Sequence, residues 1–87
     1  MKKIFDFILR LFGGIDIDKI IIPEYYKKPR EEKLRNKKLF YLRNGYFENN
    51  IIIDENNTLV DGFTTYYIAK LYEFKYIGVT RVKLKNK

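Results

Sequence analysis

Apolar and polar positions follow one another along this chain in blocks that predict three helices and several short strands. In the first block, KKIFDFILRLF at residues 2–12, the charged residues share one narrow face of a helix and apolar residues fill the remainder. Gly13 and Gly14 end that helix, since glycine reaches positive φ without steric cost. Residues 1–14 are therefore expected to form an amphipathic helix outside a domain that spans residues 15–87.

The apolar face of this helix, with Phe5, Ile8 and Phe12 on it, needs a cover. Packing on its own domain, contact with a second copy or another protein, and binding to a membrane surface all remain open. The segment is too short to cross a bilayer, which takes about 20 apolar residues. It does not resemble a signal peptide, because Asp6 and Arg10 interrupt the apolar region and no small-residue cleavage site follows.

The next blocks predict a strand, a helix and a second strand. IDIDKIIIP alternates and then runs apolar, so residues 15–23 are expected to form a strand that ends at its proline. Residues 30–44 permit a helix between Pro29 and a capping Gly45, although its apolar positions scatter around the wheel. Ile51 to Ile53 is too apolar for either face to be wet, which predicts a central strand.

The second half of the chain completes an α+β pattern with a small mixed sheet. Its expected elements are a turn at 54–57, a return strand at 58–60, an Asp-Gly corner at 61–62, a helix at 63–73 and a strand at 76–84. Cations on alternate positions of the last strand are typical of a sheet edge that is guarded against pairing with another chain.

Composition restricts the chemistry. The 87 residues make one domain, and 46% hydrophobic content indicates a folded globule. The chain has no His, Cys, Ser or Trp, which excludes thiolate or imidazole zinc sites and Ser–His or Cys–His nucleophiles. We therefore expect a protein that is not an enzyme and has no cofactor. The lack of cysteine fits a cytoplasmic setting.

The net charge of +7 is concentrated between residues 27 and 43. A patch of one sign attracts polyanions, so nucleic acid or an acidic protein surface is the expected partner. Tyr25 and Tyr26 stand beside two lysines, a pairing that also suits single-stranded nucleic acid, because bases stack on the rings and phosphates meet the lysines. The alternative is a solvated helix that keeps the domain soluble. The candidate contact residues are Tyr25, Tyr26, Lys27, Lys28, Arg30, Lys33, Arg35, Lys37, Lys38 and Arg43.

The order of elements and three quoted stretches carry a resemblance to a known superfamily. The chain resembles the ParB/sulfiredoxin-type domain over about residues 15 to 83. The stretches that carry the resemblance are "IDIDKIIIP", then "PREEKL", then "NGYFENNIIIDENNTLVDGFTTYYIAKLYEFKYIGVTRV". The resemblance implies that the segment after Gly62 carries the family's chemistry, through a phosphate-binding arginine in ParB-like members and a cysteine in sulfiredoxins. The matching stretch, Gly62 to Tyr66, has neither the arginine nor the cysteine. We therefore expect the fold of the superfamily without its nucleotide or redox chemistry.

The corner and the turn before it offer two further candidate sites. Gly62, Thr64 and Thr65 form a possible anion or nucleotide corner, because helix N-terminal amides favour anions. The alternative is that Asp61 caps the helix and the threonines are ordinary first-turn residues. Asp54, Glu55 and Asp61 are carboxylates that Mg²⁺ prefers, but turn and cap roles explain them, and we predict no metal.

These observations predict a non-catalytic binding module that engages nucleic acid or another polyanion. The alternative from another class is a phage or mobile-element inhibitor or adaptor that binds a host nucleic-acid-processing enzyme. A third hypothesis is residual nucleotide binding. A homodimer is possible on this evidence, and a membrane partner is not expected.

Overall fold

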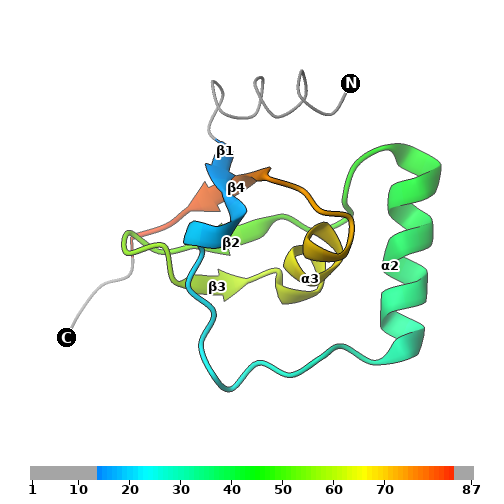
Figure 1. Cartoon of the computed structure of the whole chain (residues 1–87), viewed down its shortest axis with the longest axis horizontal. Helices are drawn as coiled ribbons and strands as arrows, with labels where there is room; N and C mark the ends of the chain where they lie inside the picture. The colour runs from blue at the N-terminus through cyan, green and yellow to red at the C-terminus, as the bar shows by residue number, and fades with distance from the viewer. Residues whose placement is uncertain (1–13, 84–87) are drawn as a thin grey trace.

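Within the described residues, four short strands form one sheet, and two α-helices lie beside it (Figure 1). The computed structural model describes residues 14–83, so the expected N-terminal helix with Phe5, Ile8 and Phe12 lies outside the described residues. The elements are β1 (Gly14–Asp16), the 3₁₀ helix η1 (Ile17–Lys19), α2 (Glu31–Asn44), β2 (Ile51–Ile53), β3 (Leu59–Asp61), α3 (Phe63–Leu71) and β4 (Tyr76–Arg81). The α+β class with a mixed sheet, predicted from the sequence, is confirmed.

The strand order β1-β4-β2-β3 places β2 and β4 inside the sheet. They run parallel, with Ile52 opposite Thr80, and each pairs antiparallel with its outer neighbour. The central position predicted for Ile51–Ile53 is therefore confirmed. The edge position inferred for the last strand is wrong for Tyr76 to Gly78, because β1 pairs with these residues, while Arg81 at the end of β4 lies beyond that pairing.

The strand predicted at residues 15–23 is also wrong in extent. β1 stops at Asp16, whose Oδ1 accepts a hydrogen bond from the amide of Asp18 at 2.9 Å and starts the 3₁₀ turn. The turn buries Ile17 and Ile20 together, three residues apart, which an extended strand would send to opposite faces. Ile21 then forms a parallel bridge to Thr58 beside β3.

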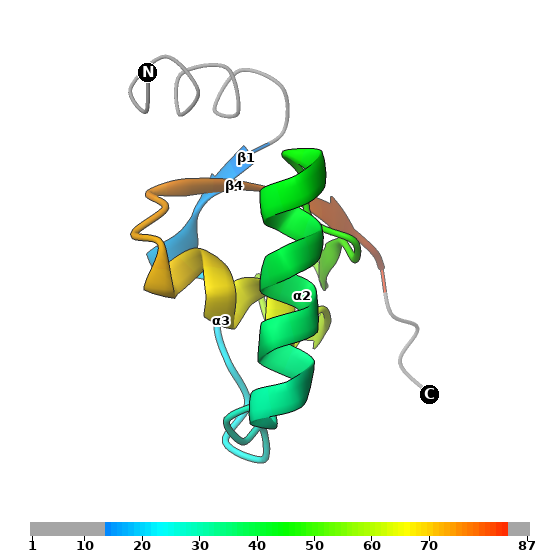
Figure 2. The ribbon, with the colours of Figure 1, turned by 90° about the vertical axis from the view of Figure 1, so that its right-hand side faces the viewer.

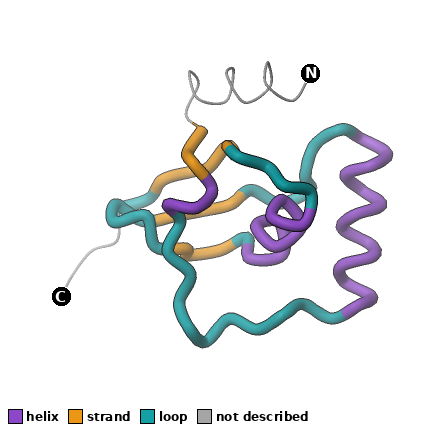
Figure 3. The backbone as a smooth tube through the Cα atoms, viewed as in Figure 1, coloured by secondary structure: helices purple, strands orange, loops and turns teal. Residues whose placement is uncertain are grey.

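The core lies between the sheet and α3. Its fully buried members come from the 3₁₀ turn, three strands and α3: Ile17, Ile20, Ile51, Ile53, Leu59, Ala69 and Ile77. α3 is the crossover that carries the chain from β3 to β4, and α2 packs on α3 (Figures 1 and 2). Residues 20–30 form a long connection that reaches the start of α2 (Figure 3).

α2 is an unbroken helix that is held at few points. It ends where Gly45 takes the left-handed conformation at φ 79°. Leu34 is its only buried residue, which reflects the scattered apolar positions of the sequence. Near its C-terminal end, the Tyr41 ring stacks on Phe47 at 4.4 Å between centroids and meets Phe74 edge-on. The helix therefore rests on one leucine and one aromatic cluster.

The corner between β3 and α3 requires glycine. Gly62 has φ 93°, and a Cβ atom there would lie 2.4 Å from the main-chain oxygen of Asn50 and 2.8 Å from the Cα atom of Ile51. Both obstacles are backbone of the segment that enters β2, so no side-chain rotation relieves the clash. The resemblance placed chemistry after this glycine, but backbone packing alone is sufficient reason for it.

Gly62→Ala should lower the free energy of unfolding by about 3 kcal/mol or more, because left-handed strain adds to a backbone clash. Gly45→Ala is the matched control, since Gly45 has φ 79° but nothing within 4 Å of its would-be Cβ. That variant should lose only about 1 to 2 kcal/mol. Urea unfolding followed by circular dichroism measures both, and equal losses would contradict the close approach at Gly62.

Candidate functional site

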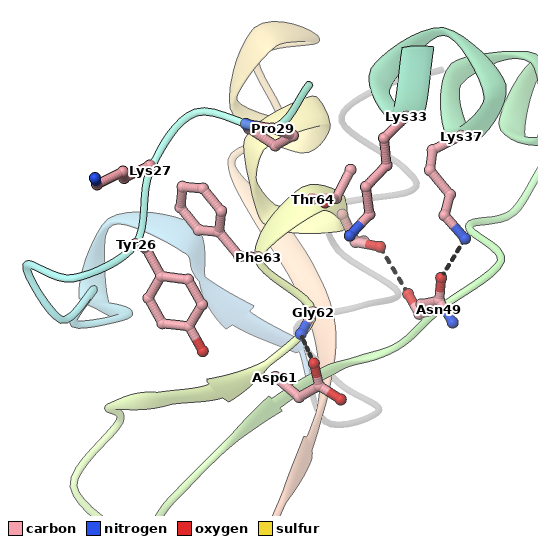
Figure 4. Close-up of a pocket in the computed structure, with 11 residues that line it drawn as sticks. Tyr26, Lys27, Pro29, Lys33, Lys37, Asn49, Asp61, Gly62, Phe63 and Thr64 are labelled. Atoms are coloured by element: carbon pink, nitrogen blue, oxygen red, sulfur yellow. Dashed lines mark hydrogen bonds between the residues drawn. The ribbon is translucent and has the colours of Figure 1, made fainter. Parts of the chain in front are cut away.

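A hollow of about 440 Å³ opens at the start of α3 (Figure 4). Its walls come from the connection before α2, the first turns of α2, the residues before β2 and the Asp-Gly corner. The lining residues are Tyr26, Lys27, Pro29, Lys33, Lys37, Asn49, Asp61, Gly62, Phe63, Thr64 and Thr65. The fold thus brings part of the basic segment together with the whole predicted anion corner.

The first turn of α3 faces this hollow without a side-chain cap. Gly62 is the N-cap residue, and no described side chain accepts a hydrogen bond from the first-turn amides. The capping role considered for Asp61 is wrong, because its Oδ1 accepts from the adjacent amide of Gly62 at 2.8 Å and not from the helix. The uncapped amides carry the positive end of the helix dipole, and the negative charge of the exposed Asp61 carboxylate offsets part of that positive potential.

The two threonines of the corner differ in what they offer a ligand. The Thr65 side chain is buried, and its hydroxyl donates to the main-chain oxygen of Asn49 at 2.9 Å. That proton is therefore committed to holding α3 against the residues before β2. Thr64 is half-buried and makes no such bond among residues 14–83. Of the pair, Thr64 is the one whose hydroxyl remains available to the hollow.

Lys33 and Lys37 extend from α2 toward the first turn of α3 and Asn49, as Figure 4 shows. The Lys37 ammonium donates to Oε1 of Glu48 at 2.9 Å and to Oδ1 of Asn49 at 2.8 Å, so much of its charge is compensated. Lys33 forms no ion pair with any residue of the described part of the chain. The side chain of Lys27 points away from Gly62. Lys33 is thus the uncompensated cation that faces the corner.

A second hollow, of about 650 Å³, continues along the start of α2 and shares Pro29, Lys33 and Lys37 with the first. Lys28 and Arg30 line it, together with the carboxylates of Glu32 and Glu48. Lys28 also lies 3.6 Å from Glu31, in an exposed pair. The other predicted contact residues on α2, namely Arg35, Lys38 and Arg43, line neither hollow. Only part of the basic segment therefore lines the hollows.

The two tyrosines of the connection occupy different environments. Tyr25 is 73% exposed, whereas Tyr26 packs against the core cluster and its hydroxyl donates to the main-chain oxygen of Val60 at 3.2 Å. Burial raises the pKa of Tyr26 above its usual 10.0, and the neighbouring Tyr25 and Asp61 add to the increase. The ring of Tyr26 is thus a fixed wall of the hollow, and Tyr25 is its exposed neighbour.

Asn49, Pro29 and Phe63 line the hollow although sequence patterns did not identify them. Asn49 joins three elements, because its side chain accepts from Lys37 and its main-chain oxygen accepts from Thr65. Its only sequence signal is a place just before a strand, which many asparagines share. Pro29 and Phe63 were noted for helix starts, and the hollow forms because both helix starts meet there.

The carboxylates do not gather into a metal site in residues 14–83, where no group of three or more potential ligands is found. Oδ1 of Asp54 instead accepts from the amides of Asn56 and Thr58, which is a turn-forming role. No helix of that same stretch has the length and apolarity needed to cross a membrane.

Comparison with solved structures gives a close match in shape. The structure of a Pnob8-like ParB-N domain superimposes with a TM-score of 0.68 over 84% of this chain, at 23% sequence identity. The chain has a ParB-N-type fold. The resemblance inferred from the sequence is therefore confirmed at the level of fold. This chain spans only 30% of the length of that matched chain. No protein-family model matches the sequence, and a search of curated proteins finds no significant match.

Tyr26→Phe tests the hydrogen bond of the partly buried Tyr26 phenol. Below pH 10, the variant should lose about 0.5 to 1 kcal/mol of stability, because the bond to Val60 is lost. The folded pKa of Tyr26 is raised, so the wild-type contribution is complete below the unfolded value of 10.0 and is lost as the pH rises through the folded value.

The stability gap between wild type and Tyr26→Phe should accordingly stay constant well below pH 10.0 and narrow as the pH rises above that value. Urea unfolding of both proteins at each pH measures the gap, and lysine titration cancels in the difference. A gap that widens with pH would show that Tyr26 ionises more readily in the folded protein.

Proposed function

We propose that this protein is a non-catalytic module that binds nucleic acid, with backbone phosphates lying along the two hollows at the start of α2. The observation that carries the proposal is the position of Lys33. Its side chain lines both hollows, has no ion-pair partner in residues 14–83 and faces the uncapped first turn of α3. A cation and free amides converging on one concavity favour an anion there.

The charges around Lys33 support a chain of phosphates more than a single one. Arg30 and Lys28 extend the positive surface along the second hollow, beyond the reach of one group. The opposing carboxylates are Glu32, Glu48 and Asp61, of which Glu48 is already paired with Lys37. With a net charge of +7, the whole domain also attracts polyanions at long range.

The lining of the hollows supports binding without turnover. It offers lysines, threonines, tyrosine and acidic side chains, and the chain contains no histidine or cysteine to serve as an acid–base catalyst or nucleophile near neutral pH. The fold itself does not decide the function, since one fold hosts many activities.

Replacing Arg30 and Lys33 together by glutamine should weaken binding to nucleic acid by about tenfold or more near 0.1 M salt. Loss of two phosphate contacts should also make the plot of log K against log salt shallower by about 1.4 for a single strand. Fluorescence anisotropy of labelled single-stranded and duplex oligonucleotides, titrated from about 50 to 200 mM salt, measures both quantities.

Arg35→Gln with Arg43→Gln is the matched control, because it removes the same charge from α2 at positions that line neither hollow. It should change affinity by less than the test pair and leave the slope nearer to that of the wild type. If neither nucleic acid binds at about 50 mM salt, the proposed function is wrong. If both double variants lose affinity equally, binding depends on total charge and not on the hollows.

A further inference from the structure

A ladder of aromatic rings runs from the core to the surface beside the hollow. Phe63 lies 6.1 Å from Tyr66 between ring centroids, with planes 25° apart. Tyr26 also stacks on Phe63, at 4.9 Å and 24°, and Tyr25 contacts Tyr26 at 4.8 Å and 31°. The ladder therefore begins at α3, passes the wall of the hollow and ends at an exposed ring.

The supporting rings are fixed in place. Tyr26, Phe63 and Tyr66 all pack against the buried core cluster, and the Tyr26 hydroxyl is held by the main chain of β3. Tyr25 by contrast keeps 73% of its surface exposed, in a two-residue turn just before the basic segment. An exposed ring backed by a rigid stack loses little conformational freedom when another flat group packs on it.

Tyr25 does not line the hollow itself, but its neighbour Tyr26 does, and the cations belong to the same lining. Tyr26 and Lys27 form the wall that adjoins Tyr25, and Lys33 reaches in from α2 on the opposite side (Figure 4). Glu24 is the one acidic residue in the described connection from Ile21 to Arg30, and its side chain is exposed. Aromatic platforms beside a positively charged groove are how proteins hold single strands, with bases on the rings and phosphates on the cations.

We infer that the site selects single-stranded nucleic acid over duplex, with an unpaired base stacked on Tyr25 while the adjoining backbone passes the hollow at Lys33. This inference rests on the proposed function and names the form of nucleic acid that the same site takes. Phosphate contacts alone do not distinguish the two forms, because both carry them. The aromatic ladder distinguishes single strands from duplex, because the bases inside a duplex are already stacked on each other and cannot stack on Tyr25.

Tyr25→Leu tests the inference. It keeps an apolar side chain and all charges, and it should lower the affinity for dT and U oligonucleotides by about fivefold to a hundredfold. The affinity for a blunt duplex of the same length should not change, and the salt dependence of single-strand binding should stay as in the wild type. Anisotropy at one fixed salt concentration gives the affinities. Preference for dT or for U then identifies DNA or RNA as the strand bound.

Two further variants make the result specific. Tyr46→Leu is the matched control, because Tyr46 is also exposed, at 61%, but lies outside both hollows and the ladder. It should bind like the wild type. Tyr25→Trp should retain single-strand affinity, and since the chain has no other tryptophan, its fluorescence should be quenched by single strands and not by duplex.

The inference and the proposed function fail in different ways. If single strands and duplex bind equally, and Tyr25→Leu changes neither, the stacking role is wrong. The effect of Arg30 and Lys33 on affinity and salt slope would then still support phosphate binding. If no oligonucleotide binds the wild-type protein, both ideas are wrong together. Selective loss of single-strand binding in Tyr25→Leu, with Tyr46→Leu unaffected, supports both.

Discussion

The contact between the Asp-Gly corner and the segment before β2 determines most of this structure. Gly62 approaches the backbone of Asn50 and Ile51 so closely that a side chain has no room. Next to them, the main-chain oxygen of Asn49 accepts a hydrogen bond from the Thr65 hydroxyl. These contacts fix the start of α3 against the middle of the sheet. They thereby set the path of the crossover that returns β4 parallel to β2. They also define one wall of the hollow.

The cations that are concentrated between residues 27 and 43 of the sequence do not all share one surface of the folded domain. Lys37 serves as a tie between α2 and the residues before β2, so its charge is largely satisfied inside the molecule. Arg35, Lys38 and Arg43 line neither of the hollows that Lys33 lines. A run of cations on a helix is spread around its axis by the 3.6-residue period, and only a subset shares any one surface. The local geometry, more than the net charge, gives the site its direction.

The sequence predicted those elements whose signal is local. The uniform apolar run at Ile51 to Ile53 indicated a central strand, and Gly45 indicated the end of α2. The predictions that proved wrong depended on partners far away in the chain. β4 looked like an edge strand because nothing in its own residues shows that Gly14–Asp16, far away in the sequence, pair with its first half. The strand expected at residues 15–23 breaks because Asp16 caps a turn, an event that apolar alternation does not reveal.

The candidate site was predictable in its parts but not in its assembly. Lys33 stood out by charge, and Gly62 by its place between a strand and a helix. Nothing in the sequence indicated that they share one hollow, since that requires α2 to pack on α3. Asn49 was missed for the same reason: its contacts to Lys37 and Thr65 exist only after the chain has folded back. Long-range packing of this kind leaves no periodic trace.

The sparse attachment of α2 has a consequence for the lysines of the hollow. Of its fourteen residues only Leu34 is buried, and the aromatic contact at Tyr41 and the bonds of Lys37 supply much of the remaining hold. Elements with so few buried contacts open at a lower free energy than the whole domain needs to unfold. The outer wall of the hollow is thus the least strongly held α-helix of the described chain. Because α2 carries Lys33 and Lys37, the contacts at Leu34 and Tyr41 also hold both lysines at the first turn of α3.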